Sequence, residues 1–197
     1  WQGRALTDPL TGLPNIRALE DYLEIHPGGK VSILRMDNLE FLSRHYGILM
    51  RVHCKRTIAT SLQPLLQKDE TLFQLPGSEL VLVLLGPGTA ERLQHMVDRL
   101  NSRKIFWNNT GLDIEFGASW GMVENGEKLH HTLGQLSWLA EQSCGTTNNV
   151  LALTNSLEAA SGQTTERVLM LARIKHALEA GQFHLYAQPI QKADGSG

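Results

Sequence analysis

Side chains that could bind a metal ion or take part in a reaction occur at a few separate points of this sequence. Asp37 directly follows the mainly apolar run 31–36, and Glu79 opens the apolar run 79–85 after Pro76-Gly77-Ser78. A carboxylate at either point could bind a hard divalent cation such as Mg²⁺. The structural alternatives are a turn or helix-capping aspartate and a charged residue that opens a strand. On the residues alone, both interpretations stay open.

The cysteines and histidines form no recognisable metal or nucleophile pattern. Cys54 and Cys144 lie far apart, without a CxxC or Cys/His spacing, so we expect reduced thiols rather than a disulfide. His130 and His131 are adjacent, and neighbouring side chains on a helix point in different directions. This spacing favours a solvated helix start over a metal site.

Helical and extended patterns alternate along the first 155 residues and must position these side chains. The hairpin around Pro76-Gly77-Ser78 is the clearest local signal, because proline and glycine supply the turn dihedrals. Gly117 and Gly121 lie inside a strand pattern, which indicates a bulge or a close backbone approach. The apolar spacing predicts helices at 16–26, 49–66, 89–102 and 128–142, and strands at 31–36, 71–75, 79–85, 113–123 and 150–153.

A tight hairpin within an alternating pattern predicts an α+β fold, an α/β sandwich with a mixed and mainly antiparallel sheet flanked by helices. The composition changes after residue 155, where a polar stretch begins. We therefore divide the chain into a domain at 1–155, a linker at 156–165 and a further segment at 166–197, with one helix and one strand. The helix has an apolar stripe at Val168, Leu171, Ile174 and Leu178.

The composition is that of a soluble globular protein. The 197 residues are 42% hydrophobic and 19% charged, with a formal net charge of −2. Without a net basic field, a nucleic-acid polymer is not an expected partner. The sequence contains no apolar run of about 18 residues, so we expect no membrane contact by this chain. We expect a cytoplasmic location within a longer parent protein, with a membrane anchor as an option for the parent.

Two motifs resemble a known pair of bacterial signalling domains. Asp8-Pro9-Leu10-Thr11-Gly12-Leu13-Pro14-Asn15 resembles, at every position, the DPLTGLPN signature that opens GGDEF domains, the diguanylate cyclases. The segment Ala177 to Ile190, with Gln188-Pro189-Ile190, resembles the start of an EAL domain, a cyclic di-GMP phosphodiesterase or receptor. The resemblance implies the palm-like, ferredoxin-like fold of nucleotidyl cyclases, followed by the first helix and strand of an EAL domain.

The same resemblance implies that the nucleotide site is vestigial, with no working catalytic residue. Asp37 matches the family's first strand-end aspartate and is the candidate metal ligand. Pro76-Gly77-Ser78-Glu79-Leu80 matches the GGDEF motif itself, so Ser78 replaces the acidic metal ligand. A neutral hydroxyl is a poor ligand for a hard dication. Asp37, Gly77, Ser78 and Glu79 are therefore the remnants that we expect at this site.

Contacts to base and phosphate also depart from the family pattern. The family's guanine-reading aspartate falls near Val52, and its late phosphate-binding lysine falls at Gln142. The product-inhibition motif RxxD becomes Gln67-Lys68-Asp69-Glu70, which removes the guanidinium needed for bidentate phosphate recognition. Gln188 corresponds to a glutamine near the ligand in EAL domains, and its role requires the full-length parent.

Three functions follow from the resemblance. The first is a catalytically inactive GGDEF domain that transmits signals to, or dimerises, a downstream EAL domain that hydrolyses or binds cyclic di-GMP. The second is a GTP-sensing domain that activates the EAL phosphodiesterase, and the third is an interaction scaffold without a nucleotide ligand. The expected partners are the parent's own EAL domain, a second copy of the chain and GTP. No cofactor is required, although Mg²⁺ would accompany GTP in the second case.

Overall fold

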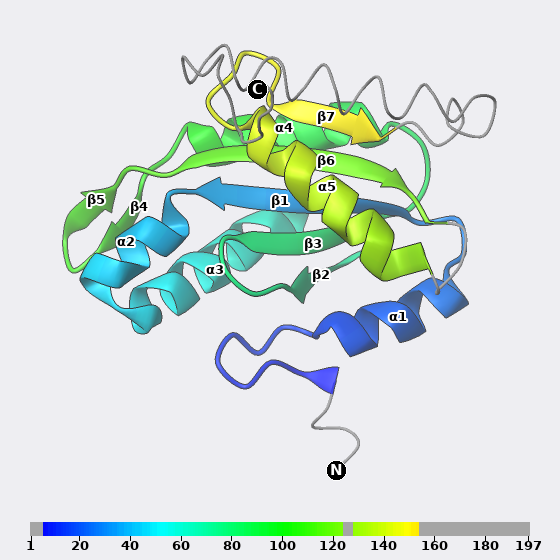
Figure 1. Cartoon of the computed structure of the whole chain (residues 1–197), viewed down its shortest axis with the longest axis horizontal. Helices are drawn as coiled ribbons and strands as arrows, with labels where there is room; N and C mark the ends of the chain where they lie inside the picture. The colour runs from blue at the N-terminus through cyan, green and yellow to red at the C-terminus, as the bar shows by residue number, and fades with distance from the viewer. Residues whose placement is uncertain (1–5, 124–127, 154–197) are drawn as a thin grey trace, which may run out of the picture. The chain divides into compact units, whose positions relative to one another are not determined.

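A five-stranded sheet forms the centre of the domain in the computed structural model, which describes residues 6–123 and 128–153 (Figure 1). The strand order is β2-β3-β1-β6-β7. β7 pairs in parallel with β6, whereas the other neighbours are antiparallel. The strands of this sheet are β1 (Lys30–Asp37), β2 (Thr71–Gln74), β3 (Glu79–Leu84), β6 (Glu115–Met122) and β7 (Val150–Leu153).

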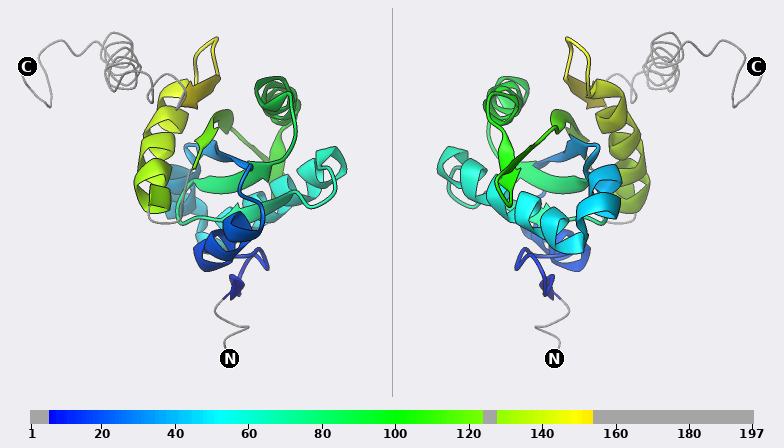
Figure 2. Two further views of the ribbon diagram at one scale, coloured as in Figure 1. Left: turned by 90° about the vertical axis from the view of Figure 1, so that its right-hand side faces the viewer. Right: turned by 90° about the vertical axis from the view of Figure 1, so that its left-hand side faces the viewer.

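Helices cover both faces of the sheet, as the side views show (Figure 2). On one face α3 and α4 bury a large apolar core with Leu34, Leu80 and Leu82. On the other face α5 packs against β1, β6 and β7. The helices are α1 (Ile16–Ile25), α2 (Leu39–Tyr46), α3 (Ile48–Leu62), α4 (Thr89–Asn101) and α5 (Leu129–Ser143), and a short 3₁₀ turn at Gln63–Leu65 follows α3.

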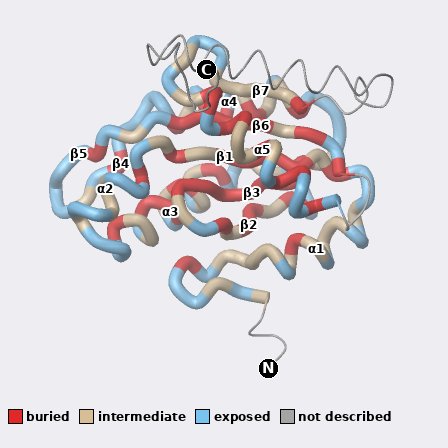
Figure 3. Tube along the Cα trace, in the orientation of Figure 1, coloured by how far each residue is buried: buried red, intermediate tan, exposed pale blue. Residues whose placement is uncertain are grey.

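Strand alternation explains this two-faced core. Successive side chains of a strand point to opposite faces, and every residue of β3 is buried, so both faces of β3 are covered (Figure 3). β1 shows the same burial over Val31–Leu34. The central strands are therefore apolar almost throughout, which is why their sequence shows short apolar runs rather than strict alternation.

The predicted α+β class and the mixed, mainly antiparallel sheet are confirmed. Two elements were not predicted: α2, and a separate hairpin of β4 (Ile105–Trp107) with β5 (Thr110–Leu112). β4 and β5 are three residues each, too short to give a clear periodicity. The expected linker and the helix and strand at 166–197 lie outside the described residues. Within the described part of the chain, no helix is both long and apolar enough to cross a membrane.

The glycines of β6 serve close packing rather than a bulge. β6 pairs continuously with β1 from Glu115 to Met122. A Cβ at Gly117 would lie 2.2 Å from the Ser143 Oγ, and a Cβ at Gly121 would lie 3.1 Å from the Leu153 carbonyl oxygen. Of the two predicted roles, close backbone approach is the correct one.

A buried ion pair joins the loop before β2 to α4. The Glu70 side chain is fully buried and accepts hydrogen bonds from both terminal nitrogens of Arg92, each at 2.6 Å. It also accepts from the backbone N–H groups of Gln67 (2.7 Å) and Leu85 (2.9 Å). Burial raises the pKa of Glu70, but these donors outweigh burial and hold the pKa below its ordinary value.

Removing the Arg92 guanidinium should destabilise the fold, because the fully buried Glu70 carboxylate would lose its charged partner. We expect Arg92→Ala to lower the free energy of unfolding by about 3–5 kcal/mol, measured by urea denaturation at pH 7. The matched control is Arg44→Ala on the exposed side of α2, which should change stability by less than about 0.5 kcal/mol. Equal effects of the two substitutions would show that the pair contributes nothing specific.

The depressed pKa of Glu70 also predicts a pH dependence. A carboxyl whose pKa is lower in the folded state stabilises the fold above its unfolded pKa. That stabilisation is lost as the pH falls through the lower, folded pKa. Urea denaturation between pH 7 and pH 3 should therefore show a loss of stability that Glu70→Gln reduces. An identical slope in wild type and Glu70→Gln would contradict this assignment.

Candidate functional site

The antiparallel register brings the end of β1 and the β2–β3 turn together. Arg35 of β1 pairs with Glu79 of β3, and the Met36 N–H donates to the Ser78 carbonyl at 2.8 Å. Asp37 therefore lies next to the turn. The structure thus places Asp37, Gly77, Ser78 and Glu79 in one neighbourhood, although their side chains have different surroundings.

Ser78 acts as a cap for α2. Its side-chain Oγ accepts a hydrogen bond from the Glu40 backbone N–H at 3.1 Å, and the residue is only 3% exposed. Asn38, the residue directly before α2, has a left-handed backbone with φ of 73°, and its side chain makes no capping hydrogen bond. The first turn of a helix leaves backbone N–H groups without intrahelical partners. Ser78, from the neighbouring hairpin, satisfies one of them.

Gly77 is held against the Glu40 carboxylate. Its φ of 73° lies in the left-handed region, which favours glycine. A Cβ there would lie 2.8 Å from the Glu40 Oε1. The neighbouring Pro76 has no N–H to offer a ligand. The turn therefore lies against a carboxylate of α2. At Pro76 it also lacks a backbone N–H group that could donate a hydrogen bond to a ligand.

Glu79 connects the sheet to α5. The Ser137 hydroxyl donates to its carboxylate at 2.7 and 2.9 Å, and the Arg35 Nη1 lies 3.4 Å from its Oε2. Arg35 also approaches Asp37 at 3.4 Å. Burial lowers the pKa of Arg35, but the carboxylates of Glu141, Asp37 and Glu79 outweigh burial and raise it. Glu79 and Asp37 are thus two acceptors around one guanidinium.

No metal cluster of the usual composition occurs in residues 6–123 and 128–153, where no group of three or more His, Cys, Asp or Glu side chains could hold an ion. Asp37 is the carboxylate at the strand end, and its side chain is 36% exposed beside Arg35. Ser78 stands at the acidic metal-ligand position of the GGDEF motif, but it offers a neutral oxygen that already accepts a hydrogen bond. Cys54 and Cys144 are free thiols, as expected.

A buried lysine beneath the hairpin escaped sequence reasoning. Lys55 of α3 is 1% exposed, and its Nζ donates to the Leu75 carbonyl at 2.5 Å and to the Gln74 Oε1 at 3.3 Å. Burial lowers the pKa of Lys55 to about 8, with a smaller contribution from Arg51. A polar residue within the inward stripe of α3, one position after Cys54, was the available signal.

Lys55 also lines a small cavity of about 120 Å³ between α3, the hairpin and the N-terminal loop. Asp8, Thr11 and Arg51 are among its other lining residues. Its volume is well below the roughly 300–1,000 Å³ of typical small-molecule sites. The cavity is therefore too small to accept a whole nucleotide without rearrangement.

The loop 8–15 is fixed by its own polar groups. The Asp8 carboxylate accepts from the Thr11 N–H at 2.7 Å and from its hydroxyl at 2.6 Å. The Asn15 side chain caps α1 through the Ala18 N–H at 3.1 Å. The Gln74 N–H donates to the Pro14 carbonyl at 2.7 Å, which ties the loop to β2. These contacts give the motif a structural role that does not depend on a ligand.

The remaining predicted positions have structural surroundings. Glu70 is paired with Arg92, as described above, and Gln67 donates its backbone N–H to it. Gln142 is 7% exposed on α5, and its Oε1 is buried without a hydrogen-bond partner among the described residues. Val52 is half-buried and lines the small cavity. Gln188 lies outside the described residues.

Comparisons with known proteins agree with this fold. The chain is 59% identical over 198 residues to the probable cyclic di-GMP phosphodiesterase PdeA of Escherichia coli (strain K12), covering 100% of this chain and 27% of that protein. It is 31% identical over 190 residues to the cyclic di-GMP phosphodiesterase PdeF of the same organism, covering 96% of this chain and 25% of PdeF. The chain thus spans about a quarter of the length of these curated relatives.

A solved structure and a family model complete the comparison. A diguanylate cyclase/phosphodiesterase from Caldicellulosiruptor saccharolyticus superposes with a TM-score of 0.67 at 17% identity, covering 78% of this chain and 96% of that chain, and so shares the fold. The family model described as diguanylate cyclase, GGDEF domain, matches residues 5–147. With its signature loop, its hairpin and most of its length accounted for, this chain belongs to the GGDEF domain family.

Proposed function

We propose that this GGDEF domain is catalytically inactive and regulates a cyclic di-GMP phosphodiesterase or receptor within a longer parent protein. The observation that carries the proposal is the use of Ser78. This residue stands at the acidic position of the motif, and its hydroxyl caps α2 through the Glu40 N–H at 3.1 Å. A structural hydrogen bond therefore occupies the position where the resemblance places a metal ligand.

The other carboxylates do not compensate for that replacement. Divalent cations such as Mg²⁺ are held by several anionic or carbonyl oxygens in a defined geometry. Asp37 shares the Arg35 guanidinium with Glu79, and Glu79 also accepts from the Ser137 hydroxyl. These residues do not fit a metal pair that would activate a nucleotide hydroxyl, and we assign no metal-dependent step to them.

The surroundings of the turn also disfavour a triphosphate. The Glu40 Oε1 lies against Gly77, so a negative charge stands where phosphates would approach the hairpin. Pro76 contributes no N–H, and Gln67 and Gln142 stand at positions that the family resemblance associates with cationic phosphate contacts. These features support an inactive domain over a GTP sensor at the hairpin, which remains the second candidate.

A regulatory role is supported by the names of the relatives. PdeA and PdeF are named as cyclic di-GMP phosphodiesterases, and this chain aligns with about a quarter of each. We infer that the segment beginning near residue 166 opens an EAL domain, in which Gln188 would contact cyclic di-GMP. The GGDEF domain would then act on that domain directly, by transmitting a signal or by bringing two copies together.

The absence of cyclase chemistry is directly testable. The full chain incubated with GTP and either Mg²⁺ or Mn²⁺ should form no cyclic di-GMP detectable by liquid chromatography, because the turn lacks an acidic metal ligand. A catalytically competent GGDEF domain assayed in parallel serves as the positive control. Product formation by the wild type that Asp37→Ala abolishes would overturn the proposal. Product that persists in Asp37→Ala would point to a contaminant.

The regulatory role makes a separate prediction for the parent protein. Deleting residues 6–153 from the full-length parent should change its rate of cyclic di-GMP hydrolysis, or its affinity if it is a receptor, by about tenfold or more. The measurement compares the deletion with the intact parent at equal folded concentration. A milder variant, Ser137→Ala, loosens the link between α5 and Glu79 without removing the domain. Unchanged rate and affinity in both variants would contradict a regulatory role.

A further inference from the structure

A large groove between α3 and α4 lies apart from the β2–β3 hairpin. Its volume is about 540 Å³, within the roughly 300–1,000 Å³ of small-molecule sites. Four of its twelve lining residues are basic and none is acidic, although the whole chain has a net charge of −2. The basic residues are Arg56, Arg99, Arg103 and Lys104.

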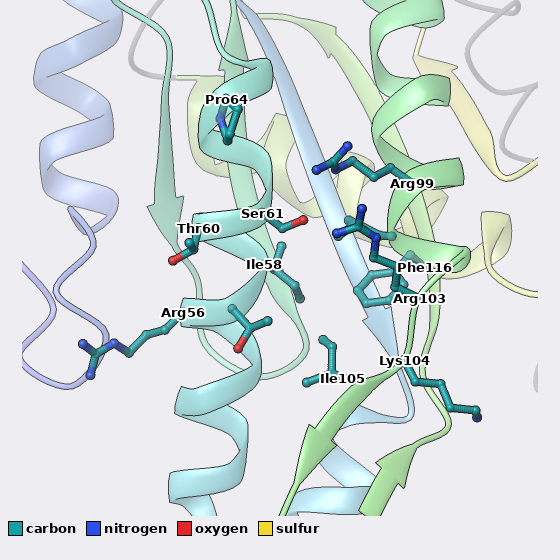
Figure 4. A pocket seen from close by; sticks show the side chains of 12 residues that line it. Arg56, Ile58, Thr60, Ser61, Pro64, Arg99, Arg103, Lys104, Ile105 and Phe116 are labelled. Atoms are coloured by element: carbon teal, nitrogen blue, oxygen red, sulfur yellow. The ribbon is translucent and has the colours of Figure 1, made fainter.

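The basic side chains have distinct positions in the groove (Figure 4). Arg99, from the last turns of α4, and Arg103, just after the helix, extend toward α3. The Ser61 hydroxyl of α3 faces them across the gap. Arg56 and Lys104 extend outward at the rim. Two guanidinium groups thus converge inside the groove, and two further cations flank its opening.

Arg99 and Arg103 lack the acidic partners that neutralise two other arginines of the domain, Arg35 and Arg92. Arg35 and Arg92 have carboxylates within 4 Å, whereas no carboxylate of the described residues forms an ion pair with Arg99 or Arg103. The Arg99 Nε is buried and has no hydrogen-bond partner among the described residues. A buried donor without an acceptor and two neighbouring like charges are both unfavourable. An anion in the groove would accept a hydrogen bond from the unpaired donor and reduce the repulsion between the two guanidinium groups.

The groove also has a fixed apolar floor. Leu100, Ile105 and Phe116 are buried beneath it. Asn101 holds this floor in place, because its side chain accepts from the Phe116 N–H at 2.9 Å and donates to the Phe116 carbonyl at 3.1 Å. An apolar floor beside convergent polar groups is the usual composition of a small-molecule site.

We propose that this groove binds a multiply charged organic phosphate of about the size of a nucleoside di- or triphosphate. The forked guanidinium groups of Arg99 and Arg103 match phosphate oxygens bidentately, Ser61 supplies a further donor, and the ring system rests on the apolar floor. The site is separate from the hairpin and needs no metal. This groove therefore goes beyond the proposed function, because it would bind a ligand that the β2–β3 hairpin does not bind.

The test is calorimetric titration of the full chain, without divalent metal, using ATP, pyrophosphate and adenosine as probes. We expect ATP and pyrophosphate to bind and adenosine to bind at least about tenfold more weakly, because charged hydrogen bonds carry the affinity. Arg99→Gln with Arg103→Gln should weaken ATP binding by about tenfold or more. Arg103→Gln alone, at an exposed residue, should weaken it several-fold and keeps the test valid if the double variant is unstable.

Two controls locate the binding. Lys68→Gln and Arg44→Gln each remove an exposed cation elsewhere, so both should leave ATP affinity unchanged. Absence of heat with ATP and pyrophosphate, or equal affinity in wild type and both arginine variants, would overturn the proposal. Binding to phosphatidylglycerol vesicles without binding to free ATP would also overturn it, by identifying a membrane surface instead. The cyclase assay scores product formation and can fail or succeed independently.

Discussion

The register between β1 and β3 is the constraint on which the rest of the site depends. Pairing Arg35 with Glu79 fixes the β2–β3 turn beside the end of β1, and the chain continues from there into α2. Because that register is set by apolar side chains buried on both faces of β3, the position of the turn does not depend on the type of side chain at residue 78. Ser78 can therefore reach the first turn of α2, and Glu79 can reach α5.

The sequence predicted the fold well because the fold is governed by patterns. Apolar runs with a proline-glycine turn specify the hairpin, and helical spacing specifies α3, α4 and α5. α2 was missed because a helix of eight residues gives little periodic signal. The β4–β5 hairpin was missed for the same reason of length. The signature loop was correctly found, and its hydrogen bonds explain why its composition is specific.

The site was less predictable because it depends on contacts between distant residues. The sequence places Asp37, Gly77, Ser78 and Glu79 near one another, but it does not show that Glu79 bonds Ser137 or that Glu40 lies against Gly77. Lys55 was missed since its partners are a backbone carbonyl and the side chain of Gln74 in the neighbouring strand. The groove between α3 and α4 combines residues from three parts of the chain, and no local pattern links them.

The contact between Ser78 and α2 bears on what an acidic residue at position 78 would do. An aspartate at position 78 could accept the same hydrogen bond from the Glu40 N–H, so the fold itself would tolerate an acidic residue there. It would, however, bring a second carboxylate close to the one that lies against Gly77. Under the proposed function, Ser78→Asp alone would therefore not restore a metal site, because the new carboxylate would first meet the repulsion of Glu40.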